Sequence, residues 1–155
     1  MTFRTVCITQ IYNEIDTGNL KRFFKYTKPL FDKIIIYDDC STDGSYEYSL
    51  ENADFVIRGK ANSFVDEVQH KQILLEKALE FSPDFIVSLD ADEIFTDNAI
   101  TELPKIFQKC IDDDADAISL KEINLWRSKS WKRIDSLFND GWFTRLWKAS
   151  SDLEL

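Results

Sequence analysis

The feature that most constrains the fold of this chain is a series of short apolar runs that alternate with segments of helical periodicity. Four runs are rich in β-branched and aromatic residues, which is typical of strands: residues 4–11, 33–37, 53–58 and 84–89. Between them, residues 19–26 and 66–81 repeat apolar side chains at helical intervals. Because the runs are solid apolar blocks, we expect an α/β fold with a mostly parallel sheet and helices on both faces.

The rest of the chain continues this alternation. Residues 99–110 predict a helix that tolerates Pro104, and residues 117–125 and 142–147 predict two further strands. A chain of 155 residues fits one domain, since at this length roughly 70% of the unfolded surface becomes buried. We therefore expect residues 1–155 to form a single domain.

Composition argues against several classes of protein. The net charge of −9 and the pI near 4.6 would repel a phosphate backbone, so nucleic acid is not an expected partner. No apolar run approaches the ~20 residues of a transmembrane helix, and the segment MTFRTVCITQ lacks the pattern of a secretory signal. We expect a cytoplasmic location, with peripheral attachment to a membrane left open. The three cysteines are scattered without a C-x-x-C spacing, which argues against a disulfide framework and against zinc.

A calcium loop is the first interpretation of the polar stretch that follows residues 33–37. Counted from Asp39, the residues Ser41, Asp43 and Gly44 match the ligand and glycine positions of an EF-hand. The twelfth position, which should be a bidentate Glu, is Leu50, and the segment before the loop is typical of a strand where the motif needs a helix. These two departures argue against calcium.

A polar turn is the second interpretation of the same stretch. Asp43 or Ser45 would then cap a short helix that runs through Tyr48. This interpretation leaves Asp38 and Asp39 unexplained, because adjacent carboxylates at the end of a buried strand repel each other unless water, a donor or a metal compensates them.

A second acidic pair follows the run at residues 84–89. Asp90 and Asp92 are two residues apart, so both side chains would leave on one face if the strand continued through them. Ligands of open α/β sheets bind beyond the carboxyl ends of the strands, where this pair and Asp39 would face one crevice. Oxygen ligands without His or Cys favour Mn²⁺ or Mg²⁺, and such an ion would let an acidic crevice accept a diphosphate. A solvated loop or a helix cap stays open as the alternative for the pair.

Three motifs resemble those of the family 2 glycosyltransferases, which have the Rossmann-like GT-A fold. They are QIYNE at residues 10–14, YDDCSTDGS at residues 37–45 and LDADE at residues 89–93, in the order of the family. The resemblance implies transfer of a sugar from a nucleotide-diphosphate donor to an acceptor hydroxyl, with inversion at the anomeric carbon. The acceptor would be a glycan or a lipid-linked molecule.

The same resemblance assigns roles to individual residues. Gln10 and Tyr12 would line the nucleobase pocket and Asp39 would contact the base. Asp90 would approach the ribose, and Asp92, with Asp90 beside it, would hold the metal on the diphosphate. These two aspartates are therefore also the predicted catalytic residues.

His70 or Lys71 falls where many family members place a polar or basic side chain near the donor. A lone histidine at the start of a helix is more often a surface residue, and this alternative stays open.

The acceptor side of the site is the least defined part of the resemblance. The general base of the family usually comes well after the metal motif, and Asp135 and Asp140 are the nearby candidates. The chain also ends earlier than family members usually end, so either one of these aspartates serves as the base or part of the acceptor site is absent from the chain. Aromatic and basic residues in this part could contact an acceptor sugar or phosphate, although core packing explains the tryptophans equally well: Trp126, Arg127, Trp131, Arg133, Trp142 and Arg145.

Two other functions compete with transfer. A shortened transferase domain could bind nucleotide-sugars without turnover. An aspartyl-phosphate phosphatase also uses an Asp-x-Asp motif, with its first Asp, here Asp90, as the nucleophile. Those enzymes place the motif after the first strand, whereas here it follows the fourth predicted strand.

Overall fold

The computed structural model describes residues 3–126, 128–133 and 141–150 of the chain. The helices and strands follow one another in this order: β1 (Thr5–Ile11), α1 (Asn19–Thr27), β2 (Lys33–Asp38), α2 (Ser45–Asn52), β3 (Phe55–Arg58), the 3₁₀ turn η1 (Phe64–Asp66), α3 (Glu67–Leu79), β4 (Phe85–Ser88), α4 (Asp97–Asp112), β5 (Ala117–Glu122), β6 (Leu125–Trp126), β7 (Ser128–Lys132) and β8 (Gly141–Lys148).

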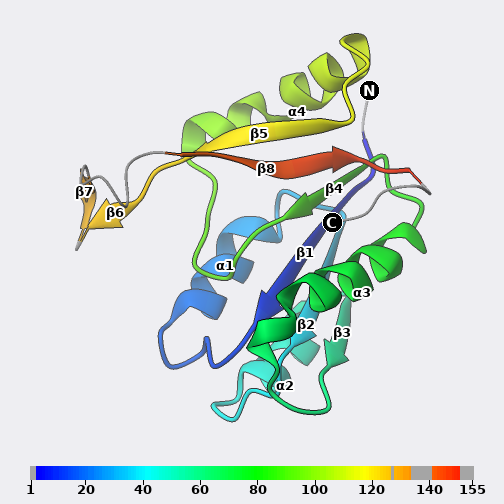
Figure 1. Ribbon diagram of the computed structural model, residues 1–155. Coiled ribbons are helices and arrows are strands. Elements are labelled where there is room, and N and C mark those ends of the chain that lie inside the picture. Colours follow the sequence, from blue (N-terminus) through cyan, green and yellow to red (C-terminus); the bar gives the residue numbers. More distant parts are fainter. Residues whose placement is uncertain (1–2, 127, 134–140, 151–155) are drawn as a thin grey trace.

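Six strands form one sheet in the order β3-β2-β1-β4-β8-β5 (Figure 1). The first four strands of the sequence are parallel to one another, and β8 runs antiparallel to both β4 and β5. A separate two-stranded ribbon, β6 and β7, projects away from the sheet at the left of Figure 1. The predicted α/β class with a mostly parallel sheet is confirmed.

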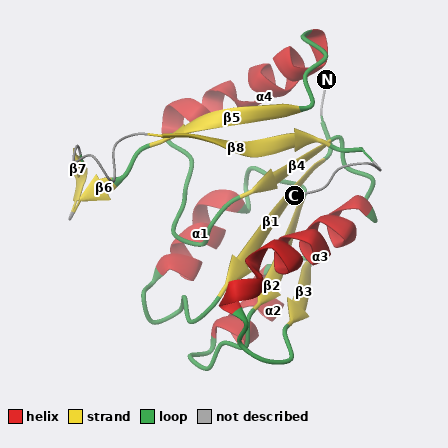
Figure 2. Cartoon of the chain, viewed as in Figure 1, coloured by secondary structure: helices red, strands yellow, loops and turns green. Residues whose placement is uncertain are grey.

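Helices cover both faces of this sheet, as Figure 2 shows for α3 in front and α1 behind. Alternate residues of each strand pack on opposite faces because side chains along a strand alternate in direction. Val6 and Ile8 of β1 pack with Leu75 of α3, whereas Cys7 packs with Phe23 of α1 on the other face. Burial on both faces explains why the central strands are continuous apolar runs.

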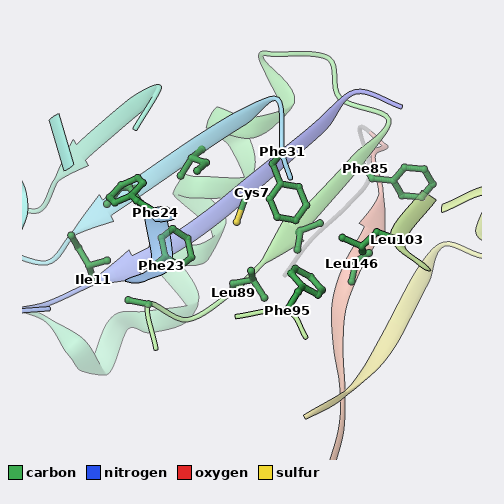
Figure 3. Close-up of a cluster of buried hydrophobic side chains, with 14 of the residues drawn as sticks. Cys7, Ile11, Phe23, Phe24, Phe31, Phe85, Leu89, Phe95, Leu103 and Leu146 are labelled. Atoms are coloured by element: carbon green, nitrogen blue, oxygen red, sulfur yellow. The ribbon is translucent and has the colours of Figure 1, made fainter. Parts of the chain in front are cut away.

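The larger of the two cores joins α1, α4 and β8 to the sheet (Figure 3). Phe85 of β4 stacks on Phe107 of α4 with ring centroids 4.5 Å apart, and Leu146 of β8 is fully buried in the same cluster. Leu89 and Phe95 also belong to it, so both ends of the loop between β4 and α4 are anchored in the core.

The edge strands differ from the central ones. Burial along β5 alternates between exposed and half-buried residues, because its side chains alternate between the two faces and Ile118 and Leu120 pack on the core at one face. The predicted helix containing Pro104 is confirmed as α4, and its Thr96 N-cap oxygen accepts a hydrogen bond from the Ala99 N–H at 3.2 Å.

Within the described residues, none of the helices combines the length and apolar character that crossing a bilayer requires.

Candidate functional site

The carboxyl ends of β1, β2 and β4 lie at one edge of the sheet. The Asp39 N–H donates to the Ile11 carbonyl at 2.9 Å, and the Leu89 N–H donates to the Ile8 carbonyl at 3.2 Å. Since β1 lies between β2 and β4, the loops after β2 and β4 leave the sheet about 10 Å apart, which is two strand spacings. The three motifs of the sequence therefore meet at this edge.

The polar turn after β2 ties two loops together. Ser41 Oγ accepts from the Asn13 N–H at 2.9 Å, and Ser45 Oγ accepts from the Glu14 N–H at 2.8 Å. Asp43 accepts from the Ile15 N–H at 2.9 Å and from the Ser45 N–H at 3.0 Å. These bonds show Asp43 as a turn residue that fastens the loop after β1 to the start of α2, in agreement with a polar turn. The expectation that Asp43 or Ser45 caps the helix is wrong, because the N-cap of α2 is Gly44 and no side chain makes a cap bond there.

Hydrogen bonding sets the charge state of Asp43. Burial of the carboxyl group works toward a higher pKa, but the bonds donated by Ser45, Asp16 and Ile15 outweigh it and lower the pKa of Asp43. The adjoining Gly44 has φ of +92°, a conformation that glycine adopts without strain.

Asp38 is fully buried below the same turn. Its carboxylate accepts from the Ser41 N–H at 3.2 Å and lies 3.6 Å from Nε of Arg58, at the end of β3. Burial raises the pKa of Asp38, although the Ser41 bonds and the Arg58 charge oppose this effect. Asp38 thus serves as a buried anchor between the ends of β2 and β3.

Asp39 is also fully buried and points to the face covered by α3. Its two carboxylate oxygens lie 3.0 and 3.2 Å from the backbone nitrogen of Ser63, which donates to them. Contact between Asp39 and a nucleobase would therefore require the segment around Ser63 to move.

Gln10 and Tyr12 occupy the end of β1 at this edge. The side-chain amide nitrogen and oxygen of Gln10 are both buried, and neither has a hydrogen-bond partner among the described residues. Tyr12 is 43% exposed. Unpaired buried amide atoms are costly, so Gln10 is suited to a ligand or water that supplies both a donor and an acceptor.

His70 packs on Tyr37, which is the register partner of Gln10 on the neighbouring strand. It is 3% exposed, its ring stacks on that of Tyr37, and its Nε2 lies 3.0 Å from Ser63 Oγ. Its Nδ1 is buried without a partner among the described residues. The alternative of a surface histidine is therefore wrong, because the position lies one helical turn before Leu74 on the buried face of α3.

Lys71 is paired with a carboxylate, unlike the adjoining His70. Its Nζ forms an ion pair at 2.6 Å with Glu67, one turn earlier on α3. In this arrangement the lysine is engaged on its own helix.

The acidic motif after β4 forms a turn. The strand ends at Ser88, and the Glu93 N–H donates to the Asp90 carbonyl at 3.0 Å, while the Asp90 N–H donates to Glu93 Oε2 at 2.9 Å. The condition that the strand continues through Asp90 and Asp92 is therefore not met, because the Glu93 side chain and backbone close a turn. Even so, Ala91 is buried while Asp90 and Asp92 are exposed, so the two carboxylates share the solvent side.

Negative charge accumulates around this turn. Desolvation of the carboxyl group, followed by the charges of Asp90, Glu14 and Glu122, raises the pKa of Asp92 even though the residue as a whole is exposed. Burial is also the main cause that raises the pKa of Glu93 to about 7. The loops after β1 and β4 and the end of β5 therefore contribute to one acidic cluster.

Arg145 of β8 supplies positive charge to this cluster. Its guanidinium group pairs with Glu93, lies 3.4 Å from Glu122 Oε2 and lies 3.5 Å from Asp90 Oδ2. Asp92 has no ion-pair partner within the described part of the chain. Asp92, which is predicted to hold a metal, is thus a carboxylate of this cluster whose negative charge no described cation balances.

A preformed metal cage is absent from residues 3–126, 128–133 and 141–150, in which no three His, Cys, Asp or Glu side chains are arranged to hold an ion. A dication at Asp92 would consequently complete its coordination with water, and with a diphosphate when a donor is bound. Two surface hollows, one beside α4 and one between α1 and α2, contain none of the predicted site residues.

The predicted acceptor side lies partly outside the described residues. This is the case for both candidate bases, Asp135 and Asp140, and for Arg127. Trp131 and Trp142 are 68% and 71% exposed, so neither is part of the core.

The roles of Glu93 and Ser63 and the carboxylate partners of Arg145 are not among the sequence-based predictions. A glutamate three residues after Asp90 could have indicated the turn, since a side chain at that spacing can accept from the earlier N–H. The contact between Arg145 and Glu93 joins residues 52 apart in sequence and has no local signal.

No protein-family model matches this sequence, and no curated protein matches it. Solved structures do match the fold. The fragment 1–349 of S. aureus TarS in complex with UDP aligns with a TM-score of 0.56 at 19% identity, covering 87% of this chain and 39% of that chain. The complex of the same fragment with UDP-GlcNAc gives a TM-score of 0.52 at 21% identity, with coverage of 87% and 38%.

A mannosyltransferase provides a further match. PcManGT from Pyrobaculum calidifontis, in complex with GDP-Man and Mn²⁺, aligns with a TM-score of 0.55 at 18% identity, covering 79% of this chain and 36% of that chain. This chain has a GT-A-like fold. It spans about two-fifths of the length of these glycosyltransferases, and at such identities the likeness extends to the fold alone.

Proposed function

We propose that this chain is the donor-binding part of a family 2 glycosyltransferase that moves a sugar, with inversion, from a nucleotide diphosphate to an acceptor hydroxyl. The observation that carries the proposal is the meeting of three motif segments at one sheet edge, in a fold shared with glycosyltransferases. Structures of TarS with UDP-GlcNAc and of PcManGT with GDP-Man support a nucleotide-sugar donor, without defining the nucleobase or the sugar here.

The nucleoside would bind at the ends of β1 and β2. Tyr12 offers an exposed ring for stacking, and the buried amide of Gln10 offers a donor and an acceptor. Asp39 and His70 lie next to Ser63, so movement of that segment would open both to the base. Lys71 would reach phosphate only after leaving Glu67.

The chemistry of the acidic turn fits a hard divalent cation. Its donors are carboxylate oxygens, and the raised pKa of Asp92 reflects, after desolvation, the repulsion of neighbouring carboxylates that a cation would relieve. Asp92 would hold Mn²⁺ or Mg²⁺ with Asp90 beside it, and the ion would supply positive charge to the departing diphosphate. The Mn²⁺ in the PcManGT structure is consistent with this choice.

The chain itself would position the donor for attack. The turn closed by Glu93 keeps Asp90 and Asp92 on the solvent side, and the buried ends of the loop fix the turn to the core. A general base would take the proton of the acceptor hydroxyl as its oxygen attacks the anomeric carbon from the side opposite the diphosphate. Asp135 and Asp140 are the candidates for that base, and a glycan or lipid-linked molecule is the proposed acceptor.

The test compares Asp92→Asn with Asp116→Asn, which changes an aspartate that is 94% exposed at the far end of β5. Release of nucleoside diphosphate from a panel of nucleotide-sugars is measured with Mn²⁺, with Mg²⁺ and with a chelator. We expect Asp92→Asn to lower metal-dependent release by about 100-fold or more, and Asp116→Asn to leave it unchanged. Thermal unfolding checks that both variants fold. Full activity of Asp92→Asn in the presence of the chelator would contradict the metal assignment.

A nucleotide-sugar-binding module without turnover is the second candidate. Calorimetric titration with nucleotide-sugars separates the two, since a module would release heat on binding and form no nucleoside diphosphate. An aspartyl-phosphate phosphatase is a weaker candidate, because the motif follows β4 and not the first strand; a covalent phosphate on Asp90 would favour it.

The cytoplasmic location, with or without peripheral attachment to a membrane, belongs to the same proposal. Fractionation of cells that express the protein, with and without a high-salt wash of the membranes, tests it.

A further inference from the structure

Arg145 connects the acidic turn to the middle of β8. Its side chain is 16% exposed, and its guanidinium group contacts carboxylates from two other segments, Glu93 in the turn and Glu122 at the end of β5. The adjoining Leu146 is fully buried in the main core, which fixes the backbone of β8 at this point. Arg145 is therefore held at the site by the sheet and not by a flexible loop.

The ion pairs of Arg145 differ in closeness and in exposure to solvent. It pairs closely with Glu93, whose side chain is 20% exposed, but it lies 3.5 Å from Asp90 Oδ2, whose side chain is 51% exposed. An exposed pair at this distance is weaker than a half-buried one, since water screens it. Asp90 is consequently the partner that Arg145 releases most easily.

A dication at the turn would change this balance. An ion held by Asp92 with Asp90 beside it would repel the guanidinium group and compete with it for the Asp90 carboxylate. Arg145 remains neutralised in either state, because Glu93 and Glu122 stay within its reach.

We infer that Arg145 is a positioning residue that pairs with Asp90 while no dication is bound and gives up Asp90 when one binds. The inference rests on the metal site of the proposed function and adds a residue that regulates it. Arg145 would then lower the affinity of the donor-free protein for the metal, while it holds the turn in place against β8.

The first experiment measures binding of Mn²⁺ alone by electron paramagnetic resonance, which counts the free ion. Removal of one positive charge within several ångströms of a dication should tighten binding, and for Arg145→Gln we expect a Kd on the order of tenfold lower than that of the wild type. Lys148→Gln is the matched control. It removes the same charge from the same strand, where Lys148 pairs with Asp114 and Asp116 away from the turn. The control should change the Kd by less than about twofold.

The outcomes separate the inference from the proposed function. If Arg145→Gln binds Mn²⁺ no more tightly than the wild type, the inference is overturned. Asp92→Asn, measured in the wild-type background, tests the metal site by itself. Loss of Mn²⁺ binding in that variant supports the site whatever Arg145→Gln does, and unchanged binding contradicts the site.

A second measurement uses the unaltered protein and so does not depend on the folding of Arg145→Gln. Addition of diamagnetic Mg²⁺ should shift the Nε–Hε resonance of Arg145 in a ¹⁵N correlation spectrum until the metal site is saturated. Arg145→Lys, which keeps the charge, assigns the resonance by its disappearance. A resonance that stays fixed while Asp90 and Asp92 amide signals shift would overturn the inference.

Discussion

The imidazole ring of His70 lies against the phenol ring of Tyr37, with centroids 4.2 Å apart and ring planes at 19°. Tyr37 is opposite Gln10 in the β1–β2 register, and His70 Nε2 lies 3.0 Å from Ser63 Oγ. The Ser63 N–H in turn donates to Asp39. The start of α3 is thus packed directly onto the sheet edge where a nucleoside would bind.

Truncation of His70 should therefore affect stability. We expect His70→Ala to lower the free energy of unfolding by about 2–4 kcal/mol, because it leaves a cavity beside Tyr37. His70→Phe keeps a ring there and should lose less. Urea unfolding measures both, with Val68→Ala as the control on the same helix, since Val68 is 70% exposed. Wild-type stability of His70→Ala would show that the ring is not packed as described.

Tyr12 should affect donor binding without affecting stability. Loss of a stacking ring costs about 1–3 kcal/mol per base, so Tyr12→Ala should weaken nucleotide binding by roughly tenfold or more. Because Tyr12 is 43% exposed, its removal should change unfolding by less than ~0.5 kcal/mol. Tyr12→Phe, which keeps the ring, should bind nearly as the wild type does in calorimetry. Unchanged affinity of Tyr12→Ala would remove this residue from the proposed pocket.

Asp43 should contribute to acid sensitivity. Its pKa is lowered in the folded protein, so its stabilising effect is complete above the ordinary value of 3.8 and is lost as pH falls through the folded value. Asp43→Asn should therefore be less stable than the wild type near neutral pH, and the difference should shrink from about pH 5 to about pH 2. Urea unfolding across this range, with Asp116→Asn as an exposed control, measures the effect. A difference that grows on acidification would contradict the assigned hydrogen bonds.

Arg58 should contribute more to the free energy of unfolding than a surface arginine does. Its partner Asp38 is fully buried, so Arg58→Met leaves a buried carboxylate without its cation and should cost about 1–2 kcal/mol, after allowance for the 40% exposure of the Arg58 side chain. Arg4→Met, which breaks an exposed pair with Asp84, should cost no more than about 1 kcal/mol.

The loss in Arg58→Met should also depend on pH. Because the pKa of Asp38 is raised, its carboxyl group becomes protonated at a higher pH than that of an ordinary aspartate. A protonated carboxyl group needs no cation, so the loss of unfolding free energy in Arg58→Met should diminish as the pH falls. Equal effects of Arg58→Met and Arg4→Met at all pH values would count against the buried ion pair.

Much of the fold could be predicted because its signals are local. The β-branched run at β2 and the apolar spacing of α3 follow from strand and helix geometry alone, and both elements match the structure closely. The burial of His70 could also be predicted from the sequence, since His70 shares the helical spacing of Leu74 and Ala78. The chemistry of histidine alone favours a surface position, whereas its place in the apolar pattern favours burial.

Other features depend on contacts between distant segments. The insertion of β8 between β4 and β5 gives the sheet its two antiparallel pairs, and nothing within the sequence of β8 specifies its neighbours. The turn at Asp90 replaced the expected strand because Glu93 supplies a local hydrogen bond that competes with the sheet. The gathering of the motifs was predictable from strand order, whereas the burial of Asp39 beneath Ser63 was not.

The position of β8 has a consequence for how the protein forms during synthesis. Until Gly141–Lys148 emerges from the ribosome, β4 has one open edge and β5 lacks a strand to pair with among the described strands. The first four strands can assemble early, but closure of the sheet waits until β8 is translated, and such long-range pairing is slow. The nascent chain therefore exposes unpaired strand edges until β8 is translated, and in this interval chaperones would be most needed.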